Sequence, residues 1–370
     1  VSIERIYQIM LYHIFYPLSS DYSFLNVFRY ITFRSAYSGV TALVFSMLMG
    51  GMMIRMLREF QIGEKIRGDG PQSHVVKSGT PTMGGLLILS TLIMSTLLWA
   101  DLTNSYVRLA LLATFCFGLI GFVDDVMKLK NSKGMTARVK LVLQVLLSLA
   151  IGVYLIYFDP TRSEYATRLY IPFFKEFKPD LGVWYLLLIV VTIVGTSNAV
   201  NLTDGLDGLA IGPIIIATIT YTLILYLCGH FKFSEYLRIQ HIKDAGEIAV
   251  FSSAVVGASL GFLWFNSYPA QMFMGDVGSL SLGGLLGTIA VIAKHELLLL
   301  LVGGIFVIEA LSVIIQVAYF KYTGGKRFFK MAPLHHHFEH SGWAEPKVIV
   351  RFWIVAVILA MISLSTLKLR

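Results

Sequence analysis

The sequence has few charged residues, and this scarcity excludes an ordinary soluble protein. Only 14% of its 370 residues are charged, whereas 56% are hydrophobic, and the mean hydropathy is +0.72. A soluble domain has about 45–50% apolar and about 25% charged residues. A water-soluble fold cannot bury so much apolar surface, so we expect lipid to form part of the solvent.

Cysteine is also scarce, and Cys116 and Cys228 both lie in apolar runs. This excludes a disulfide framework and a cysteine-rich metal site, so packing is the simplest role for both residues. The sequence further lacks the glycine-rich loops that bind ATP or dinucleotides, so the substrate itself must supply the energy. The formal net charge is +8, but Lys and Arg are scattered through connecting segments. Such charge is typical of loop topology and anionic lipid contact, and no nucleic-acid partner is expected.

Apolar runs long enough to cross a bilayer recur along the chain. A transmembrane helix needs roughly 20 mostly apolar residues. The runs that meet this test are 36–57, 83–100, 107–123, 139–158, 181–200, 208–229, 248–265, 278–293, 297–320 and 349–367. We therefore expect an all-α polytopic membrane protein with about ten transmembrane helices. It would form one integral membrane domain over 1–370, with an N-terminal interfacial segment at 1–35 and a transmembrane core at 36–367. The connection 159–180 allows a small hairpin.

Every second connection between these runs carries an unusual polar sequence. These odd-numbered connections are 55–81, 124–138, 201–208, 266–278 and 321–347. Because alternating spans place them on the same side, their motifs are expected to converge on one face. Lys and Arg are slightly more frequent there, which favours the cytoplasmic side and places both termini outside.

The first motif is the pair Asp124 and Asp125, which directly follows an apolar run. Adjacent carboxylates repel each other unless they share a cation or a proton. The pair therefore indicates metal binding or proton abstraction. The alternative is a solvated helix end that pairs with Lys128 and Lys130.

The second motif combines carboxylates, amides and glycines in one turn. Its polar positions are Asn198, Asn201, Asp204 and Asp207, with Gly205 and Gly208. Such a turn can contact a sugar or a base closely. Helix capping by Asp207 is the alternative, but it would leave the other polar residues unexplained.

The third motif contains Asn266, Phe273 and Asp276. An aspartate between glycines at a membrane boundary suits a hard divalent cation, although an ordinary Asp-Gly turn is the alternative. Phe273 could stack on a planar base or pack in the core.

The fourth motif is the triplet His335, His336 and His337, close to Lys326 and Arg327. Consecutive side chains rarely converge on one zinc ion, so imidazoles that face phosphates are the better interpretation. A fifth motif, Lys77–Gly85, is compatible with a helix start that lies near an anion, and a plain helix start is the alternative. Glu309 and Gln316 share one helical face, and they either line a cavity or join helices by hydrogen bonds.

Together these features indicate a transfer between a water-soluble phosphoester and a lipid phosphate, in which a divalent ion neutralises charge. A transporter is the rival class. Its acidic residues would lie at the midplane of discontinuous helices, whereas here they lie mostly at helix ends.

In this order the motifs resemble the polyprenyl-phosphate N-acetylhexosamine-1-phosphate transferases. The segments that carry the resemblance are Gly79–Gly85, Gly121–Asp125, Asn198–Leu209, Phe262–Asn266, Met274–Ser279 and Met331–Glu339. The histidine triplet is what narrows the resemblance to the muramoyl-pentapeptide branch. A sister enzyme that uses UDP-N-acetylglucosamine is the alternative within the superfamily.

The resemblance implies transfer of phospho-N-acetylmuramoyl-pentapeptide from UDP-N-acetylmuramoyl-pentapeptide (UDP-MurNAc-pentapeptide) to undecaprenyl phosphate. The products are lipid I and UMP, and this is the first membrane step of peptidoglycan synthesis. It also implies Mg²⁺ dependence, membrane lipid as surroundings, a homodimer, and five cytoplasmic loops in the bacterial inner membrane.

The resemblance also implies roles for individual residues. Asp276 would bind Mg²⁺, and Asp124 and Asp125 would handle the lipid phosphate, with one of the two as its base. His335 and His336 would act with them as catalytic groups in contact with phosphate. The substrate-binding set would be Lys77, Thr82, Lys128, Asn198, Asn201, Asp204, Gly205, Leu206, Asp207, Asn266, Phe273, Gln316 and His337. Direct attack and an aspartyl intermediate both stay open.

Overall fold

The structure is a computed structural model that describes residues 10–60, 79–131, 134–159, 161, 164–174 and 176–368. These residues form helices joined by turns, and they include no β-strand. In this part of the chain, nine helices are long and apolar enough to cross a membrane. A tenth apolar helix, α4 (Gly85–Trp99), has 15 residues. The prediction of an all-α polytopic membrane protein is confirmed, and the protein is a multi-pass membrane protein.

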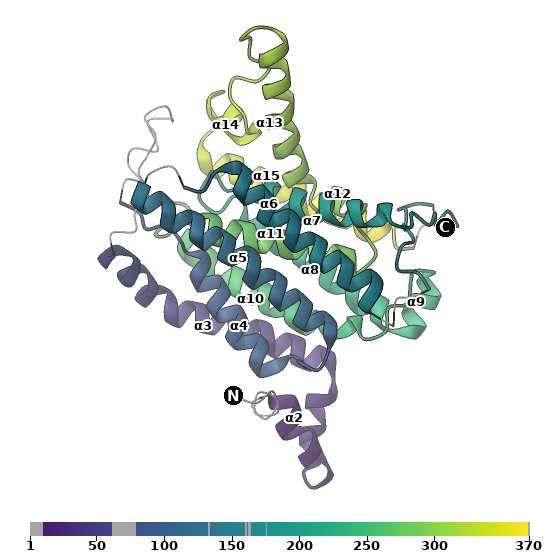
Figure 1. The fold of residues 1–370 in the computed structure, drawn as a ribbon. Coiled ribbons are helices and arrows are strands. Elements are labelled where there is room, and N and C mark those ends of the chain that lie inside the picture. The colour runs from purple at the N-terminus through teal and green to yellow at the C-terminus, as the bar shows by residue number, and fades with distance from the viewer. Residues whose placement is uncertain are drawn as a thin grey trace.

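Most helices follow the predicted runs within a few residues (Figure 1), but the run predicted to end at 123 continues as a helix to Asn131, so Asp124 and Asp125 lie within it. The spanning helices are α3 (Ile31–Glu59), α5 (Ser105–Asn131), α6 (Ala137–Val153, extended by a π-turn at Tyr154–Phe158), α7 (Trp184–Thr203), α8 (Ile211–Gly229), α10 (Ile248–Asn266), α11 (Gly275–Ile292), α13 (Gly304–Tyr322) and α15 (Glu345–Ser365). The shorter helices are α2 (Leu11–Phe15), α9 (Phe231–Leu237), α12 (Leu299–Val302) and α14 (Leu334–Glu339). Two 3₁₀ turns, Pro17–Ser20 and Ser23–Arg29, connect α2 to α3.

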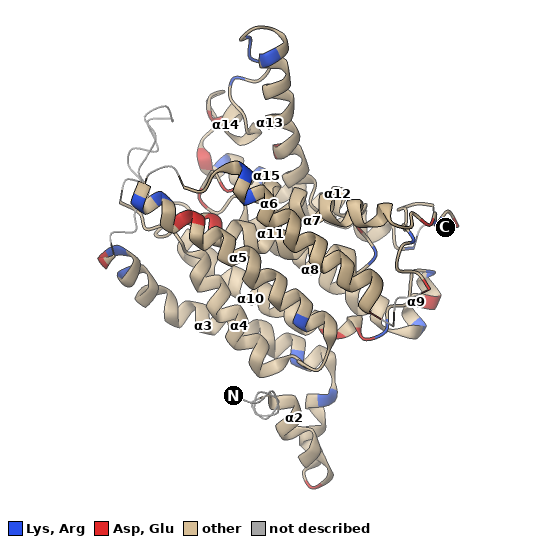
Figure 2. Cartoon of the chain, viewed as in Figure 1, with Lys and Arg blue, Asp and Glu red and all other residues tan. Residues whose placement is uncertain are grey.

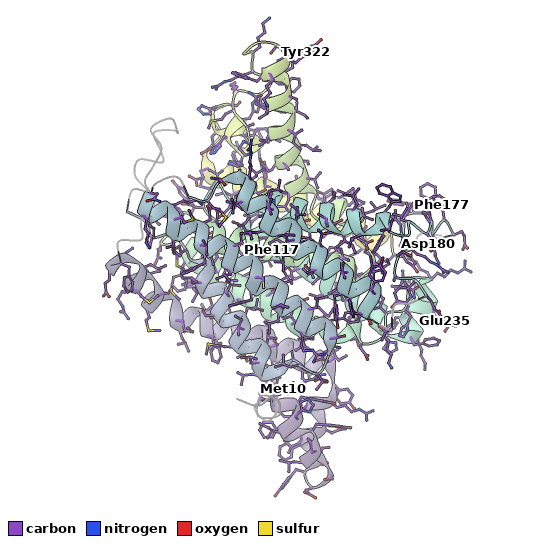
Figure 3. The ribbon with its side chains drawn as sticks, in the orientation of Figure 1. Met10, Phe117, Phe177, Asp180, Glu235 and Tyr322 are labelled. Atoms are coloured by element: carbon purple, nitrogen blue, oxygen red, sulfur yellow. The ribbon has the colours of Figure 1, made fainter. Side chains whose placement is uncertain are left out.

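Helix α11 forms the centre of the bundle, packed between α5 and α7. Glycines permit this close packing, because small residues let helix backbones approach one another in membranes. A Cβ atom added at Gly283 would lie 2.7 Å from Cα of Ser197 in α7. One added at Gly284 would lie 2.5 Å from the ring of Phe117 in α5, which Figure 3 shows in the middle of the bundle. Larger residues at these positions would push the three helices apart.

Charged residues gather at the two ends of the helices and leave the middle largely apolar (Figure 2). One end, called the motif face below, contains the described parts of the odd-numbered connections. The other end, called the opposite face, joins the even-numbered connections to one another. Contacts there include Asp101 N–H to Glu247 (2.8 Å), Asn104 to the Asp244 carbonyl (2.8 Å) and Lys294 to the Ala166 carbonyl (2.9 Å). The expectation that alternating spans place the odd-numbered connections on one face is therefore confirmed for the described residues.

Two expectations about individual segments need correction. The predicted single helix over 297–320 is wrong, because Gly303 ends α12 and α13 then starts in a new direction at Gly304. Helix α13 projects beyond the bundle, with Tyr322 near its far end (Figure 3). Among the described residues of 159–180, the expected hairpin is reduced to a single antiparallel bridge between Arg168 and Asp180.

Candidate active site on the motif face

Three carboxylates from two helices form the centre of the motif face. Asp124 and Asp125 lie on α5, and Asp276 lies in the first turn of α11. Each offers an oxygen atom, and these atoms all lie within 4.8 Å of one another. The two helices meet because Gly121 has no side chain: a Cβ atom there would lie 2.1 Å from the carbonyl oxygen of Asp276. We call Asp124, Asp125 and Asp276 the acidic trio.

Two lysines pair with the acidic trio and offset part of its negative charge. Nζ of Lys128 lies 3.0, 3.2 and 3.1 Å from Asp124, Asp125 and Asp276, respectively. Nζ of Lys140 on α6 lies 2.8 Å from Asp124 and 2.6 Å from Asp276. The sequence pointed to Lys128 but missed Lys140. In the sequence, Lys140 is marked only as a basic residue in the first turn of an apolar helix, and Arg138 in the same turn fits that description equally well.

Backbone N–H groups and one amide complete the surroundings of the acidic trio. Met135 N–H donates to Asp124 (2.6 Å), and Val277 N–H donates to Asp125 (3.1 Å). The side-chain amide of Asn201 donates to Asp276 (2.8 Å). Asn198 lies one turn earlier on α7 and donates to Gln144 on α6 (2.7 Å), so it joins helices. Of the two asparagines, Asn201 is therefore the one that contacts the acidic trio.

The acidic loop, Asn201–Gly208, is held by two other connections. Asp207 accepts a hydrogen bond from Ala270 N–H (2.9 Å) and donates its own N–H to Glu345 (3.1 Å). Oδ1 of Asn266 accepts the N–H of Gly208 (3.0 Å). Helix α8 starts only at Ile211 and has no side-chain cap, so the capping interpretation of Asp207 is wrong. Asp207 instead ties the acidic loop to the 266–278 connection.

The fifth motif pairs with the third through the backbone. Phe273 N–H donates to the Pro81 carbonyl (2.8 Å), and Gly84 N–H donates to the Phe273 carbonyl (2.8 Å). Thr82 lies beside Gly275, whose positive φ of 73° suits glycine. This pairing brings the start of α4 to the acidic trio. Lys77 lies outside the described residues.

The histidine loop, Met331–Glu339, is anchored to α13 by buried Glu309. Its carboxylate accepts the N–H groups of Leu334 (2.7 Å) and His335 (3.1 Å), and it lies 3.2 Å from Nδ1 of His335. Burial lowers the pKa of the His335 imidazole, which is fully enclosed. A Cβ atom at Gly205 would lie 2.3 Å from Nε2 of His335. The histidine loop and the acidic loop are therefore in direct contact.

The other two histidines have different partners. Nδ1 of His336 lies 2.8 Å from Glu339, and Nδ1 of His337 accepts the N–H of Lys330 (3.1 Å). The rings of His335 and His336 lie 4.2 Å apart, but the three imidazoles have different hydrogen-bond partners.

Two further predicted residues are engaged in packing or in holding a loop. Gln316 accepts the N–H groups of Phe328 (3.1 Å) and Phe329 (2.8 Å). Glu309 joins α13 to α14 by hydrogen bonds, which is one of the two alternatives, whereas Gln316 holds the connecting segment before α14. The Leu206 side chain is buried in an apolar cluster with Ile305 and Phe352.

Fold and site together define a class: a multi-pass membrane protein with a site of three carboxylates and two lysines near the ends of its helices. Carboxylate oxygens suit a hard divalent cation, and ammonium groups suit phosphate. Residues 107–294 match the glycosyl transferase family 4, and residues 77–89 match the phospho-N-acetylmuramoyl-pentapeptide-transferase signature 1.

Relatives with this same printed name align with nearly the whole chain. The phospho-N-acetylmuramoyl-pentapeptide-transferases of Desulforapulum autotrophicum and Desulfatibacillum aliphaticivorans are each 58% identical to it, and that of Citrifermentans bemidjiense is 55% identical. Each alignment covers 98% of this chain and 100% of the relative. The chain belongs to the glycosyl transferase family 4 and, within it, to the phospho-N-acetylmuramoyl-pentapeptide-transferases.

Proposed function

We propose that this transferase moves phospho-N-acetylmuramoyl-pentapeptide from UDP-MurNAc-pentapeptide to undecaprenyl phosphate, giving lipid I and UMP. In this reaction an oxygen of the lipid phosphate bonds to the phosphorus next to the sugar, and the bond from that phosphorus to UMP breaks. The acidic trio with its two lysines is the observation that carries the proposal, because it lies at the helix ends where both substrates can meet. The full-length relatives supply the identity of the sugar.

The acidic trio has a donor set that fits Mg²⁺, since three carboxylates lie together at a membrane boundary. Asp276 would be the principal ligand, beside Asp124 and Asp125. When bound, Mg²⁺ would neutralise charge on the phosphates. Lys128 and Lys140 already reach the same carboxylates, so they can turn to phosphate oxygens when a metal takes their place.

The remaining residues divide between the two substrates. Asp124 and Asp125 would orient the lipid phosphate, and His335, His336 and His337 would contact phosphate or arrange the loops that do. The nucleotide sugar would lie against Lys77, Thr82, Lys128, Asn198, Asn201, Asp204, Gly205, Leu206, Asp207, Asn266, Phe273 and Gln316. Support for this pocket comes from the contacts that join the described loops, such as that of Gly205 with His335.

The motif face would point to the cytoplasm of a bacterial cell, from the inner membrane, and both termini would then lie outside. The nucleotide sugar is water-soluble and carries the activated phosphate, so the site must face the compartment that holds it. We further propose a homodimer and a single transferase domain over residues 1–370.

Substrate choice tests the proposal. Purified chain with undecaprenyl phosphate and Mg²⁺ should release UMP from UDP-MurNAc-pentapeptide and form a lipid-linked product of matching mass. Turnover confined to UDP-N-acetylglucosamine would reassign the chain to a sister activity. Uptake of nucleotide sugar by proteoliposomes without product would favour a transporter.

A further inference from the structure

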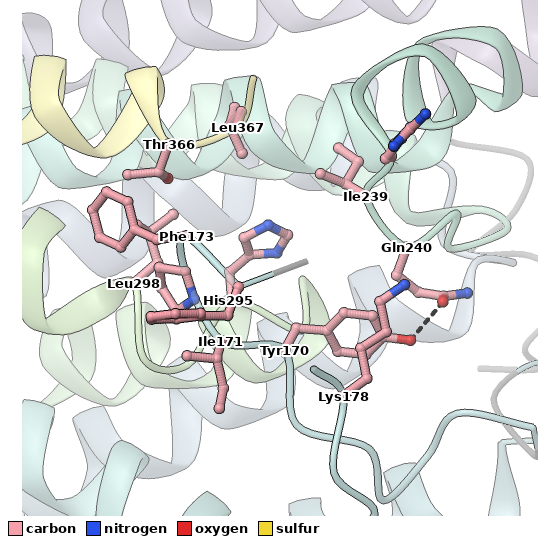
Figure 4. A pocket seen from close by; sticks show the side chains of 13 residues that line it. Tyr170, Ile171, Phe173, Lys178, Ile239, Gln240, His295, Leu298, Thr366 and Leu367 are labelled. Atoms are coloured by element: carbon pink, nitrogen blue, oxygen red, sulfur yellow. Dashed lines mark hydrogen bonds between the residues drawn. The ribbon is translucent and has the colours of Figure 1, made fainter. Parts of the chain in front are cut away.

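A small cavity on the opposite face takes no part in the proposed reaction. Its volume is about 50 Å³. Four separate parts of the chain line it: the 170–178 connection, residues 238–240 after α9, residues 295–298 around the start of α12, and residues 366–367 after α15 (Figure 4). The cavity therefore exists only in the assembled bundle.

The charged side chains of this cavity are positive. Lys178 and Arg238 line it, and none of the described lining residues is acidic. Nζ of Lys178 lies 5.6 Å from the ring centre of Tyr170, and Nζ of buried Lys294 lies 5.9 Å from the same centre. The Tyr170 hydroxyl donates to Gln240 (2.6 Å; Figure 4), which fixes the ring. Two ammonium groups thus lie beside one oriented tyrosine, and Lys294 is held there by the Tyr185 ring (3.7 Å) and the Ala166 carbonyl (2.9 Å).

Two lining residues adopt backbone conformations that side chains disfavour. Phe173 has φ of 71° and Arg238 has φ of 54°, both in the left-handed region. Such strain persists only where the surrounding structure imposes it, and it clusters at ligand sites. Arg238 ends α9, with its N–H directed to the Glu235 carbonyl (3.1 Å). The fold therefore imposes the backbone geometry from which an aromatic and a cationic side chain reach the cavity.

The rim of the cavity is apolar and faces outward. Phe173 and Phe174 are 47% and 65% exposed, and Leu298 and Leu367 are buried beside them. Aromatic rings and basic side chains at helix ends are typical of the membrane interface. A ligand that fits must combine an anionic group for the cations with alkyl chains for the rim.

We infer that this cavity binds the headgroup of an acidic phospholipid between Lys178 and Arg238, with the acyl chains against Phe173 and Phe174. The lipid comes from the leaflet at the opposite face. A zwitterionic headgroup would bring its own cation to a cationic cavity, and free phosphate has no chains for the apolar rim. The inference depends on the fold and not on the proposed reaction.

Native mass spectrometry of the detergent-solubilised full chain tests the inference, with phosphatidylglycerol and phosphatidylcholine as probes. Phosphatidylglycerol should bind more tightly. Lys178→Gln with Arg238→Gln should weaken its binding about thirtyfold, and each single change about fivefold. Each Lys or Arg at the interface attracts an anionic lipid by about 1 kcal/mol, which corresponds to a factor of about five in affinity. The matched control is Lys232→Gln with Lys243→Gln, which removes two exposed cations of the same face that do not line the cavity. The control should leave binding unchanged.

Three results would overturn the inference. Equal weakening in the control pair would mean diffuse attraction to the whole face. Equal binding of both lipids would remove the role of the cations. Displacement of the lipid by excess inorganic phosphate would mark a site for soluble anions. Each variant should elute as a single peak in gel filtration, and the single changes serve if the double variant does not.

Discussion

The side-chain amide of Asn201 donates a 2.8 Å hydrogen bond to Oδ1 of Asp276, across 75 residues of sequence. The same amide donates to Ser279 (2.8 Å). The other oxygen of Asp276 faces Lys128 and Lys140. Helices α5, α6 and α7 therefore set the orientation of one carboxylate on α11, so a change in any of them should reach the acidic trio.

Asp276→Asn should lower the rate of UMP release at least about a hundredfold, since even the outer partners of a metal site typically contribute 10- to 100-fold. The fold should persist, because asparagine has the same shape. Rates measured across a magnesium titration test this, with Asp101→Asn on the opposite face as the control. Near-normal turnover at saturating magnesium would refute the role of Asp276 as a ligand.

Lys140→Met should destabilise the metal-free protein by about 2 kcal/mol, because it removes charged hydrogen bonds to two carboxylates. Magnesium should then stabilise this variant more than the wild type, since the metal no longer competes with the ammonium group. Thermal unfolding in detergent, with and without magnesium, measures both effects. An equal magnesium response in the two proteins would contradict the arrangement.

Gly205→Ala should loosen the contact between the acidic loop and the histidine loop. The new methyl group would overlap His335, which is buried and held by Glu309, and such overpacking typically costs about 1–3 kcal/mol. We expect a lower melting temperature and weaker binding of the nucleotide sugar. Gly195→Ala is the matched control, because a Cβ atom there meets no atom within 4 Å. Comparable behaviour of the two variants would show that the contact is unimportant.

Glu309→Gln should release the start of the histidine loop. The carboxylate accepts two backbone N–H groups, and an amide nitrogen would turn a donor towards one of them, at a cost of about 1–3 kcal/mol. Hydrogen–deuterium exchange at Leu334 and His335 should accelerate. Ser312→Ala, a buried change on the same helix, should leave both amides protected. Unchanged exchange in Glu309→Gln would mean that other contacts hold the loop.

The hydropathy of the runs and the alternation of their connections were sufficient to predict most of the fold. The apolar runs are long, and lipid imposes one solution on each of them, so α4, α7, α8, α10 and α11 fall within about three residues of expectation. The end of α5 was missed by eight residues, because its last turns are polar, and the short helix α9 was not predicted. The break at Gly303 was missed because α12 and α13 form one continuous apolar run, and hydropathy carries no information on helix direction.

The site was only partly predictable for a similar reason. The acidic residues stand out because carboxylates are costly at a membrane boundary. Lys140 does not stand out, since its partners Asp124 and Asp276 lie on other helices, 16 and 136 residues away. The roles of Gly205 and Glu309 also depend on tertiary structure. Both residues contact His335, and the sequence around them does not predict that contact.

Metal binding by the acidic trio is the most direct test of the site. Electron paramagnetic resonance with Mn²⁺ as the probe should detect one bound ion per chain in the wild type. Asp276→Asn should abolish this signal, and Asp101→Asn should retain it. An undiminished bound-ion signal in Asp276→Asn, or no bound ion in the wild type, would contradict the metal site proposed for Asp124, Asp125 and Asp276.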